Sequence, residues 1–226
     1  SFSRRRLQRT KLVWDTCRLN ERIAQFFSEL PAARKNGYTR EMFLLGGGGS
    51  CRACAGSGVI ETEFDVGGSA GEQCAVCHGR RYAPELDAVN YKEASISDVL
   101  ESEVKTALQL FSARLEILQI LLVFDALGLS GLRLGERASR LAQSVQQRLE
   151  LARLFVSCRP NGVLYLLDQP LAGLSRADVE VCMPQLHKIA RQGGSIFFST
   201  HDHFAAALSD FVVELGEGGE VELRSA

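Results

Sequence analysis

Hydrophobic residues near the start of the chain recur at helical spacing. Leu19, Ile23, Phe26 and Phe27 fall on one face of a 3.6-residue period. We therefore expect the opening, to about Phe43, to be largely helical. A run of four glycines and Ser50 then ends this regular pattern.

The pattern changes again over residues 51–82, which are rich in glycine and cysteine. Val59, Glu61 and Glu63 alternate with other residues, and the turn-rich run 67–71 follows them. This arrangement predicts a β-hairpin with a flexible tip.

Two helices are expected after the hairpin. Ser102 is placed to cap the first, which carries Val104, Ala107, Leu108 and Phe111. The second carries leucines from Leu115 to Leu122 and should stop near Gly128.

The final third alternates strand and helix. Apolar runs at 163–167, 195–199 and 211–213 predict strands, the first of them buried. Ser175, with Asp178 three residues later, resembles a capping box that starts a helix between the first two strands. Strand–helix–strand at this spacing indicates a parallel sheet with crossover helices, and therefore an α/β fold.

Composition is that of an ordinary globular protein. Of the 226 residues, 46% are hydrophobic and 23% charged, and the formal net charge is −1. No apolar run approaches the roughly 20 residues that span a bilayer, and the basic start is not followed by the apolar stretch of a signal peptide, so we expect a cytoplasmic protein and no membrane partner. Residues 1–50 carry ten lysines and arginines against four acids, which could attract phosphate or could simply be solvated.

Four of the seven cysteines form two Cys-x-x-Cys pairs, Cys51 with Cys54 and Cys74 with Cys77. Two such pairs joined by a hairpin can close a tetrahedral four-sulfur site with no open position, so we expect a structural Zn²⁺. Free or redox-active thiols are the alternative. His78 would be a bystander because four thiolates fill the shell.

The remaining cysteines and the glycine run before Cys51 are interpreted in light of this zinc site. The other three cysteines, Cys17, Cys158 and Cys182, are expected to be core residues. The run Gly46–Ser50 is interpreted as native glycine before a zinc knuckle, and an engineered linker is the alternative.

Polar residues follow the first two predicted strands. Asp168 and Gln169 come directly after the strand at 163–167, and Thr200-His201-Asp202 follow the strand at 195–199. An acid at the carboxyl edge of a parallel sheet is where Mg²⁺ of a nucleoside triphosphate is held, and a histidine there could reach a γ-phosphate. Each residue alone could equally be structural, but their order is that of an ABC-type ATPase.

A set of motifs in fixed order gives a specific resemblance. They are Cys51-x2-Cys-x-Gly-x-Gly, Cys74-x2-Cys-x-Gly-x-Arg-Tyr, Ser95-Ile-x-Asp-Val-Leu, Gly128-Leu-x3-Arg-Leu-Gly, Gln147-Arg148, Leu167-Asp-x-Pro-x2-Gly-Leu and Thr200-His201. From about Val13 to the end, the chain resembles the C-terminal cassette of UvrA, the excinuclease subunit that finds bulky DNA lesions.

The resemblance implies a fold and a division of the chain. The fold would be a partial ABC-type ATPase core with a parallel sheet, a helical signature lobe and an inserted zinc-binding β-hairpin. The implied parts are the helical start of the lobe (1–45), the zinc hairpin (46–90), the remaining lobe (91–157) and the C-terminal half of the ATPase core (158–226).

It also implies site residues. Asp168 would hold Mg²⁺ of bound ATP, Gln169 would stand in the place of the catalytic glutamate, and His201 would be the switch histidine. Gly173 would belong to the D-loop. The signature segment and its helix would contribute Ala142, Gln143, Ser144, Gln147 and Arg148.

Three departures from the family pattern bear on activity. No Gly-x4-Gly-Lys-Ser/Thr occurs in the sequence, and we expect the phosphate-binding loop to lie before Ser1. Gln143 adds a side chain where the signature needs clearance, and Gln169 cannot accept a proton from the attacking water. We expect this chain alone to hydrolyse no ATP, although the enzymatic status of the whole protein stays open.

The resemblance further implies DNA, a second copy and other excision-repair subunits as partners. Arg52, Arg80 and Arg81 flank the knuckles and could contact phosphate, or could be solvated arginines. The alternative function is a non-catalytic, zinc-stabilised interaction or dimerisation module. A DnaJ-type chaperone module has similar cysteine repeats but carries four of them, and it would not explain Asp168 and His201.

Overall fold

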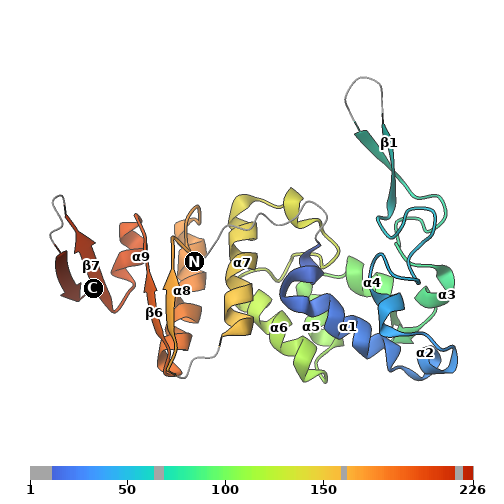
Figure 1. Cartoon of the computed structure of the whole chain (residues 1–226), viewed down its shortest axis with the longest axis horizontal. Coiled ribbons are helices and arrows are strands. Elements are labelled where there is room, and N and C mark those ends of the chain that lie inside the picture. The colour runs from blue at the N-terminus through green and yellow to red at the C-terminus, as the bar shows by residue number, and fades with distance from the viewer. Residues whose placement is uncertain (1–11, 64–68, 159–161, 217–220, 226) are drawn as a thin grey trace. The chain divides into compact units, whose positions relative to one another are not determined.

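A computed structural model of the chain describes residues 12–63, 69–158, 162–216 and 221–225 (Figure 1). These residues form two compact units. The helical unit contains Leu12–Leu121 and Gly131–Glu136, and the sheet unit contains Leu122–Ser130 and the described part of Arg137–Ala226. The division into four parts expected from the sequence stays a prediction.

The helical unit is built from short helices and two hairpins. Its elements are η1 (Val13–Arg18), α1 (Leu19–Ser28), α2 (Pro31–Lys35), η2 (Arg40–Phe43), β1 (Val59–Glu63), β2 (Ser69–Gln73), α3 (Pro84–Asp87), β3 (Asn90–Tyr91), β4 (Ala94–Ser95), α4 (Ile96–Glu101), α5 (Val104–Leu110) and the start of α6 (Leu115–Ala126).

An aromatic core holds this unit together. Trp14, Phe27, Phe43 and Phe111 are fully buried, and Phe26 packs edge-to-face on Tyr91 with ring centroids 4.7 Å apart. Such ring pairs stabilise a core beyond the area that they bury. The predicted helical face of α1 is confirmed, because Leu19, Ile23, Phe26 and Phe27 are all buried.

The predicted hairpin is confirmed, with one correction to its turn. β1 pairs antiparallel with β2 from Val59↔Gln73 to Glu63↔Ser69, and in Figure 1 the hairpin extends away from α3 and α4. Ser69, Ala70 and Gly71 belong to β2 rather than to the tip. Residues 64–68, which include the start of the expected turn, lie outside the described residues.

The sheet unit contains the parallel pair that the sequence predicts. Its elements are the end of α6, η3 (Ala138–Arg140), α7 (Gln143–Ser157), β5 (Leu164–Leu167), α8 (Arg176–Arg191), β6 (Ser195–Phe198), α9 (His203–Ala207), β7 (Phe211–Leu215) and β8 (Val221–Ser225). β5 and β6 run parallel from Leu164↔Ser195 to Leu167↔Phe198, with α8 as their crossover. The predicted capping box of Ser175 and Asp178 starts α8.

Three local expectations were wrong. Ser102 does not cap α5: the N-cap is Glu103, and the Ser102 hydroxyl donates to the Val99 carbonyl at the end of α4. β5 is not buried along its length, since Leu166 is 65% exposed. β7 pairs antiparallel with β8 instead of extending the parallel sheet.

The three cysteines expected in the core differ in how deeply they are buried. Among the predicted core cysteines, Cys182 is buried, and burial raises the pKa of its thiol to about 12. Cys17 and Cys158 are only half-buried. No helix among the described residues is long and apolar enough to cross a membrane.

Candidate metal centre and sheet-edge pocket

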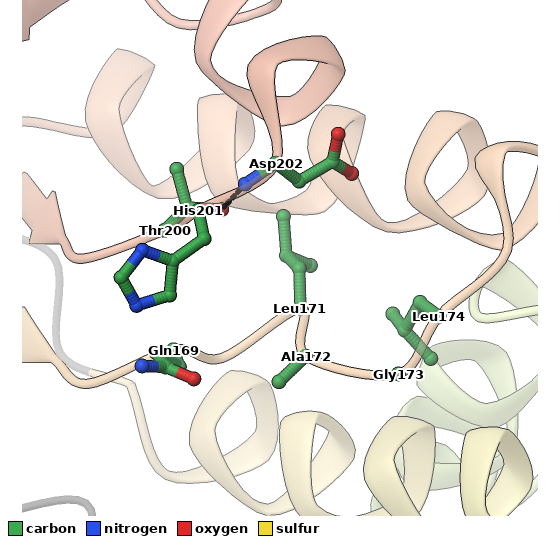
Figure 2. Close-up of a pocket in the computed structure, with 8 residues that line it drawn as sticks. All are labelled: Gln169, Leu171, Ala172, Gly173, Leu174, Thr200, His201 and Asp202. Atoms are coloured by element: carbon green, nitrogen blue, oxygen red, sulfur yellow. Dashed lines mark hydrogen bonds between the residues drawn. The ribbon is translucent and has the colours of Figure 1, made fainter.

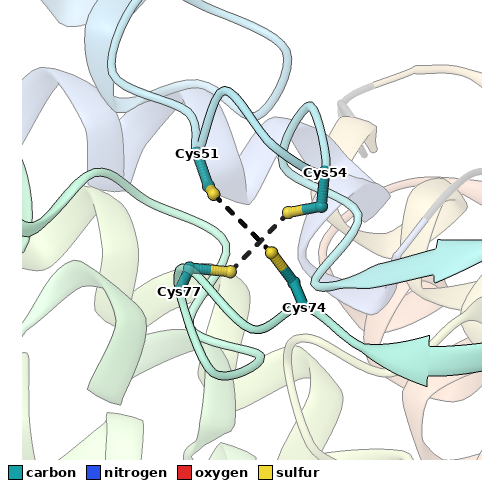
Figure 3. Close-up of side chains that lie close together, drawn as sticks. All are labelled: Cys51, Cys54, Cys74 and Cys77. Atoms are coloured by element: carbon teal, nitrogen blue, oxygen red, sulfur yellow. Dashed lines mark hydrogen bonds between the residues drawn. The ribbon is translucent and has the colours of Figure 1, made fainter.

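The four cysteine sulfurs converge on one point, as Figure 3 shows. All four lie within 4.8 Å of one another, with Cys51 Sγ 3.9 Å from Cys74 Sγ and Cys54 Sγ 3.6 Å from Cys77 Sγ. Zn–S bonds of about 2.3 Å in a tetrahedron require sulfur–sulfur edges of about 3.8 Å, whereas a disulfide would need about 2.05 Å. The spacing is that of a metal shell, and the cluster is compatible with structural zinc.

The two knuckles share one backbone conformation. Ala55 and Gly56 follow the first pair with φ of +50° and +82°, and His78 and Gly79 follow the second with the same two values. In the second knuckle the His78 N–H donates to the Cys74 carbonyl at 2.8 Å. His78 is exposed and outside the cluster, as expected for a bystander.

The thiols differ in how readily they ionise. Hydrogen bonding from the Cys77 backbone N–H lowers the pKa of Cys74 to about 7. Burial raises the pKa of Cys77 to about 12. Zinc binds thiolates, so metal binding must displace protons from this cluster.

The glycine run before the first knuckle is packed against its surroundings. A Cβ on Gly49 would collide with the Met42 carbonyl oxygen and with Leu86, and a Cβ on Gly47 would collide with the Glu41 carbonyl oxygen. This packing gives the glycines a steric reason in the fold and favours the interpretation of native glycine.

Arg80 ties the second knuckle to the helices of the same unit. Its guanidinium pairs with Asp87, and its Nη2 donates to Ser95 Oγ at 3.0 Å and to Asp98 Oδ1 at 3.1 Å. Burial raises the pKa of Asp87, but the hydrogen bonds from Arg80, Ser97 and Ser95 and the charge of Arg80 together outweigh it, so the pKa of this carboxyl lies below its usual value. The hydrogen bond to Asp87 raises the pKa of Arg80 in turn.

The other two arginines expected at DNA differ from each other. Arg81 donates from Nη2 to the Gly135 carbonyl at 2.9 Å, within the same unit. Arg52 lies exposed between the first two cysteines. Of the three, Arg52 is therefore the one most open to a phosphate, and DNA contact stays a prediction for the set.

A pocket of about 400 Å³ lies at the carboxyl ends of β5 and β6 (Figure 2). Its walls are the loop after β5, with Gln169, and the loop after β6, with Thr200, His201 and Asp202. The loop after β5 also contributes Leu171, Ala172, Gly173 and Leu174. The structure thus brings Gln169, Gly173 and His201 together as the sequence predicts, although none of the eight lining residues is lysine or arginine.

Asp168 is not among the lining residues, but it directly precedes Gln169 and is bonded to Ser199. The Ser199 hydroxyl donates to Asp168 Oδ1 at 2.7 Å and accepts the Gln169 N–H at 3.0 Å. Sequence reasoning missed Ser199, because the contact joins residues 31 apart. Its place directly after β6, next to the Thr200-His201 pair, is the one signal that could have found it.

The predicted residues of α7 are not among the eight that line the pocket, and one of them is bonded to the loop after β5. Gln147 Nε2 donates to the Pro170 carbonyl at 2.6 Å. A Cβ on Gly173 would lie 3.6 Å from Gln143 Nε2. Ala142 is the N-cap of α7, and Ser144 is half-buried in its first turn.

Arg148, the last of the predicted residues of α7, bonds to other residues of the sheet unit. Its Nη1 lies 3.4 Å from Asp178 and donates to the carbonyls of Leu127 at 3.1 Å and Gly128 at 3.2 Å. The side chain is only 13% exposed. These contacts connect α7 with the start of α8 and with the end of α6, all in the sheet unit.

No protein-family model matches the chain. UvrABC system protein A of Xylella fastidiosa (strain 9a5c) is 36% identical to it over 199 residues, which are 87% of this chain and 21% of that protein. UvrABC system protein A of Neisseria meningitidis (serogroup A / serotype 4A) is 35% identical over 201 residues, or 88% of this chain and 21% of that protein. Among solved structures, UvrA2 from Deinococcus radiodurans matches with a TM-score of 0.79 and 33% identity, over 92% of this chain and 26% of that one. The chain spans about a fifth of the length of the curated relatives.

Proposed function

This chain belongs to the UvrA family, and we propose that it supplies one wall of a nucleotide-binding site and a zinc-stabilised module to a protein of nucleotide excision repair. One observation carries the proposal. Asp168-Gln169 and Thr200-His201 follow two adjacent parallel strands, Gln169 and His201 line the same pocket, and Asp168 directly precedes Gln169. Ligands of parallel α/β sheets bind at this edge.

The residues present suit Mg²⁺ and a nucleotide in part. Asp168 offers a carboxylate, the ligand type that Mg²⁺ prefers, and Mg²⁺ would neutralise phosphate charge there. Gln169 and His201 offer hydrogen bonds to a water molecule or to a phosphate oxygen. The pocket lining has no lysine or arginine, so phosphate binding would depend on groups outside this lining.

We further propose that hydrolysis is impaired. An amide at Gln169 can orient water but cannot take its proton, and loss of a general base typically costs about 10²–10⁴ in rate. Gln143 stands where the family signature has glycine, and a glycine there leaves the backbone open to a phosphate. The amide of Gln143 lies close to Gly173.

Binding of MgATP to the purified chain tests this function. We expect Mg²⁺-dependent binding, measured by calorimetry, that Asp168→Ala weakens and Glu214→Ala, a charge removal on β7, leaves unchanged. We also expect no ATP turnover above the Asp168→Ala background. Binding that is identical in the Asp168→Ala variant, or turnover by the wild-type chain, would contradict the proposal.

DNA binding is proposed for the exposed Arg52 beside the first knuckle. Removing one arginine–phosphate contact should reduce the slope of log K against log[salt] by roughly one unit. Arg52→Ala should therefore weaken binding of a duplex in fluorescence anisotropy and flatten its salt dependence, while Lys35→Ala, another exposed cation of the helical unit, should not. Equal binding by both variants would exclude this contact.

A zinc-stabilised interaction or dimerisation module is the second candidate function. It is favoured by the absence of lysine and arginine from the pocket lining and by the commitment of Arg80 to Asp87 and Asp98. Zinc-dependent self-association in sedimentation, without MgATP binding, would support it, with a second copy and other excision-repair subunits as the proposed partners.

A further inference from the structure

The hydroxyl of Ser199 joins the ends of two strands. It donates to Asp168 Oδ1 at 2.7 Å and accepts from the Gln169 N–H at 3.0 Å, while the Ser199 N–H donates to the Leu167 carbonyl at 3.0 Å. Three consecutive residues at the end of β5 are thus held by one residue at the end of β6.

Gln169 needs such support because its backbone is in an unfavourable conformation. Its φ is +45°, in the left-handed region that residues with a Cβ rarely adopt. Backbone strain of this kind persists where neighbouring groups hold it, and it is frequent at functional sites. The acceptor for the Gln169 N–H is the Ser199 hydroxyl.

The orientation has a consequence for the pocket. Figure 2 shows the side chains of Gln169 and His201 on the same side of the pocket, one from each loop. The Ser199 hydroxyl donates a hydrogen bond to Oδ1 of Asp168. Oδ2 makes no hydrogen bond with any residue in the described part of the chain. One carboxylate oxygen is therefore fixed, and the described residues place no hydrogen bond on the other.

We propose that Ser199 is a positioning residue of this site, which orients the Asp168 carboxylate toward a divalent cation and holds Gln169 facing the pocket. The cation, Mg²⁺ of a nucleoside triphosphate, rests on the proposed function. The positioning of Gln169 and Asp168 by the Ser199 hydroxyl does not depend on the proposed function.

The ligand-free test is amide hydrogen exchange of Gln169 by NMR, with its HN–Hα coupling as a measure of φ. Loss of one hydrogen bond should raise exchange about fivefold in Ser199→Ala, and Ser199→Thr, which keeps the hydroxyl, should restore it. Ser195→Ala is the matched control at the other end of β6, where the serine is exposed and makes no side-chain hydrogen bond to a described residue. Unchanged exchange and coupling in Ser199→Ala would overturn the proposal.

The second measurement uses Mn²⁺ as the probe. In the wild-type chain we expect paramagnetic broadening of the Thr200 and His201 amides, with affinity weakened about fivefold by Ser199→Ala, restored by Ser199→Thr and lost in Asp168→Asn. Equal Mn²⁺ affinity in wild type and Ser199→Ala would overturn the orientation of Asp168. If the wild type binds no Mn²⁺, the cation of the proposed function is refuted, and the exchange of Gln169 still decides whether Ser199 positions it.

Discussion

Removal of the metal should unfold the zinc module while the aromatic core of the same unit stays folded. Among the described residues, the hydrophobic cluster at the knuckles consists of the four cysteines. The core that contains Trp14, Phe27, Phe43 and Phe111 is built from other segments, apart from Tyr82, whose hydroxyl donates to the Phe43 carbonyl. The two parts therefore have different sources of stability.

The magnitudes decide the outcome for residues 51–82. Ordering this segment costs backbone conformational entropy at every residue. The backbone hydrogen bonds that close the module, such as Cys51 N–H to Arg81 and Cys74 N–H to Gly58, return about 1 kcal/mol each. A structural zinc contributes roughly 10–16 kcal/mol. Without it, the folded module has no comparable replacement.

Hydrogen exchange with mass spectrometry can follow this local unfolding. After complete removal of the metal with a chelator, verified by elemental analysis, peptides from 51–82 should exchange fully, and those from 96–111 should keep their protection. Adding Zn²⁺ back should restore the first set. If peptides 51–82 stay protected in the metal-free chain, then the metal is not the source of the module's stability and the reasoning fails.

Three further outcomes can be tested by equilibrium unfolding. Gly49→Ala should destabilise the zinc-loaded chain by about 1–3 kcal/mol through overpacking, whereas Gly48→Ala, where a Cβ meets only Met42 Cγ at 3.8 Å, should cost far less; equal effects would contradict the steric argument. Arg148→Ala should cost about 2–4 kcal/mol because it strands Asp178 and two backbone carbonyls, and Arg148→Lys should recover only part of this, since lysine lacks the guanidinium fork; full recovery would show that charge alone matters. The pKa of Asp87 is lowered, so its contribution is present above its unfolded pKa of about 3.9 and is lost as pH falls through the folded value; the stability difference between wild type and Asp87→Asn should therefore shrink below about pH 4, and a constant difference would refute this.

Local patterns predicted the parts of the molecule that local interactions build. The Cys-x-x-Cys spacing specifies a knuckle within a few residues, and the sulfurs converge as expected. The pair Ser175 and Asp178 also forms its capping box. Ser102 shows the limit of this reasoning, because its hydroxyl bonds backward to Val99 and the sequence alone does not distinguish the two directions.

Contacts between distant residues could not be predicted in this way. Arg80 meets Asp98 eighteen residues away, and the sequence offered it equally as a solvated or phosphate-binding arginine. The apolar run at β5 predicted burial, yet Leu164 is 59% and Leu166 65% exposed, because among the described residues nothing covers that face. Apolar composition shows which residues can be buried, but not which element covers them.

The contacts between α7 and the loop after β5 limit how that loop can move. Gln147 holds Pro170, Gln143 lies against Gly173, and Arg148 is anchored to Asp178 at the start of α8. The loop is therefore bonded to α7 through Gln147 and lies close to Gln143, while Arg148 attaches α7 to the start of α8. A movement of this loop that keeps the bond to Gln147 must carry α7 along with it.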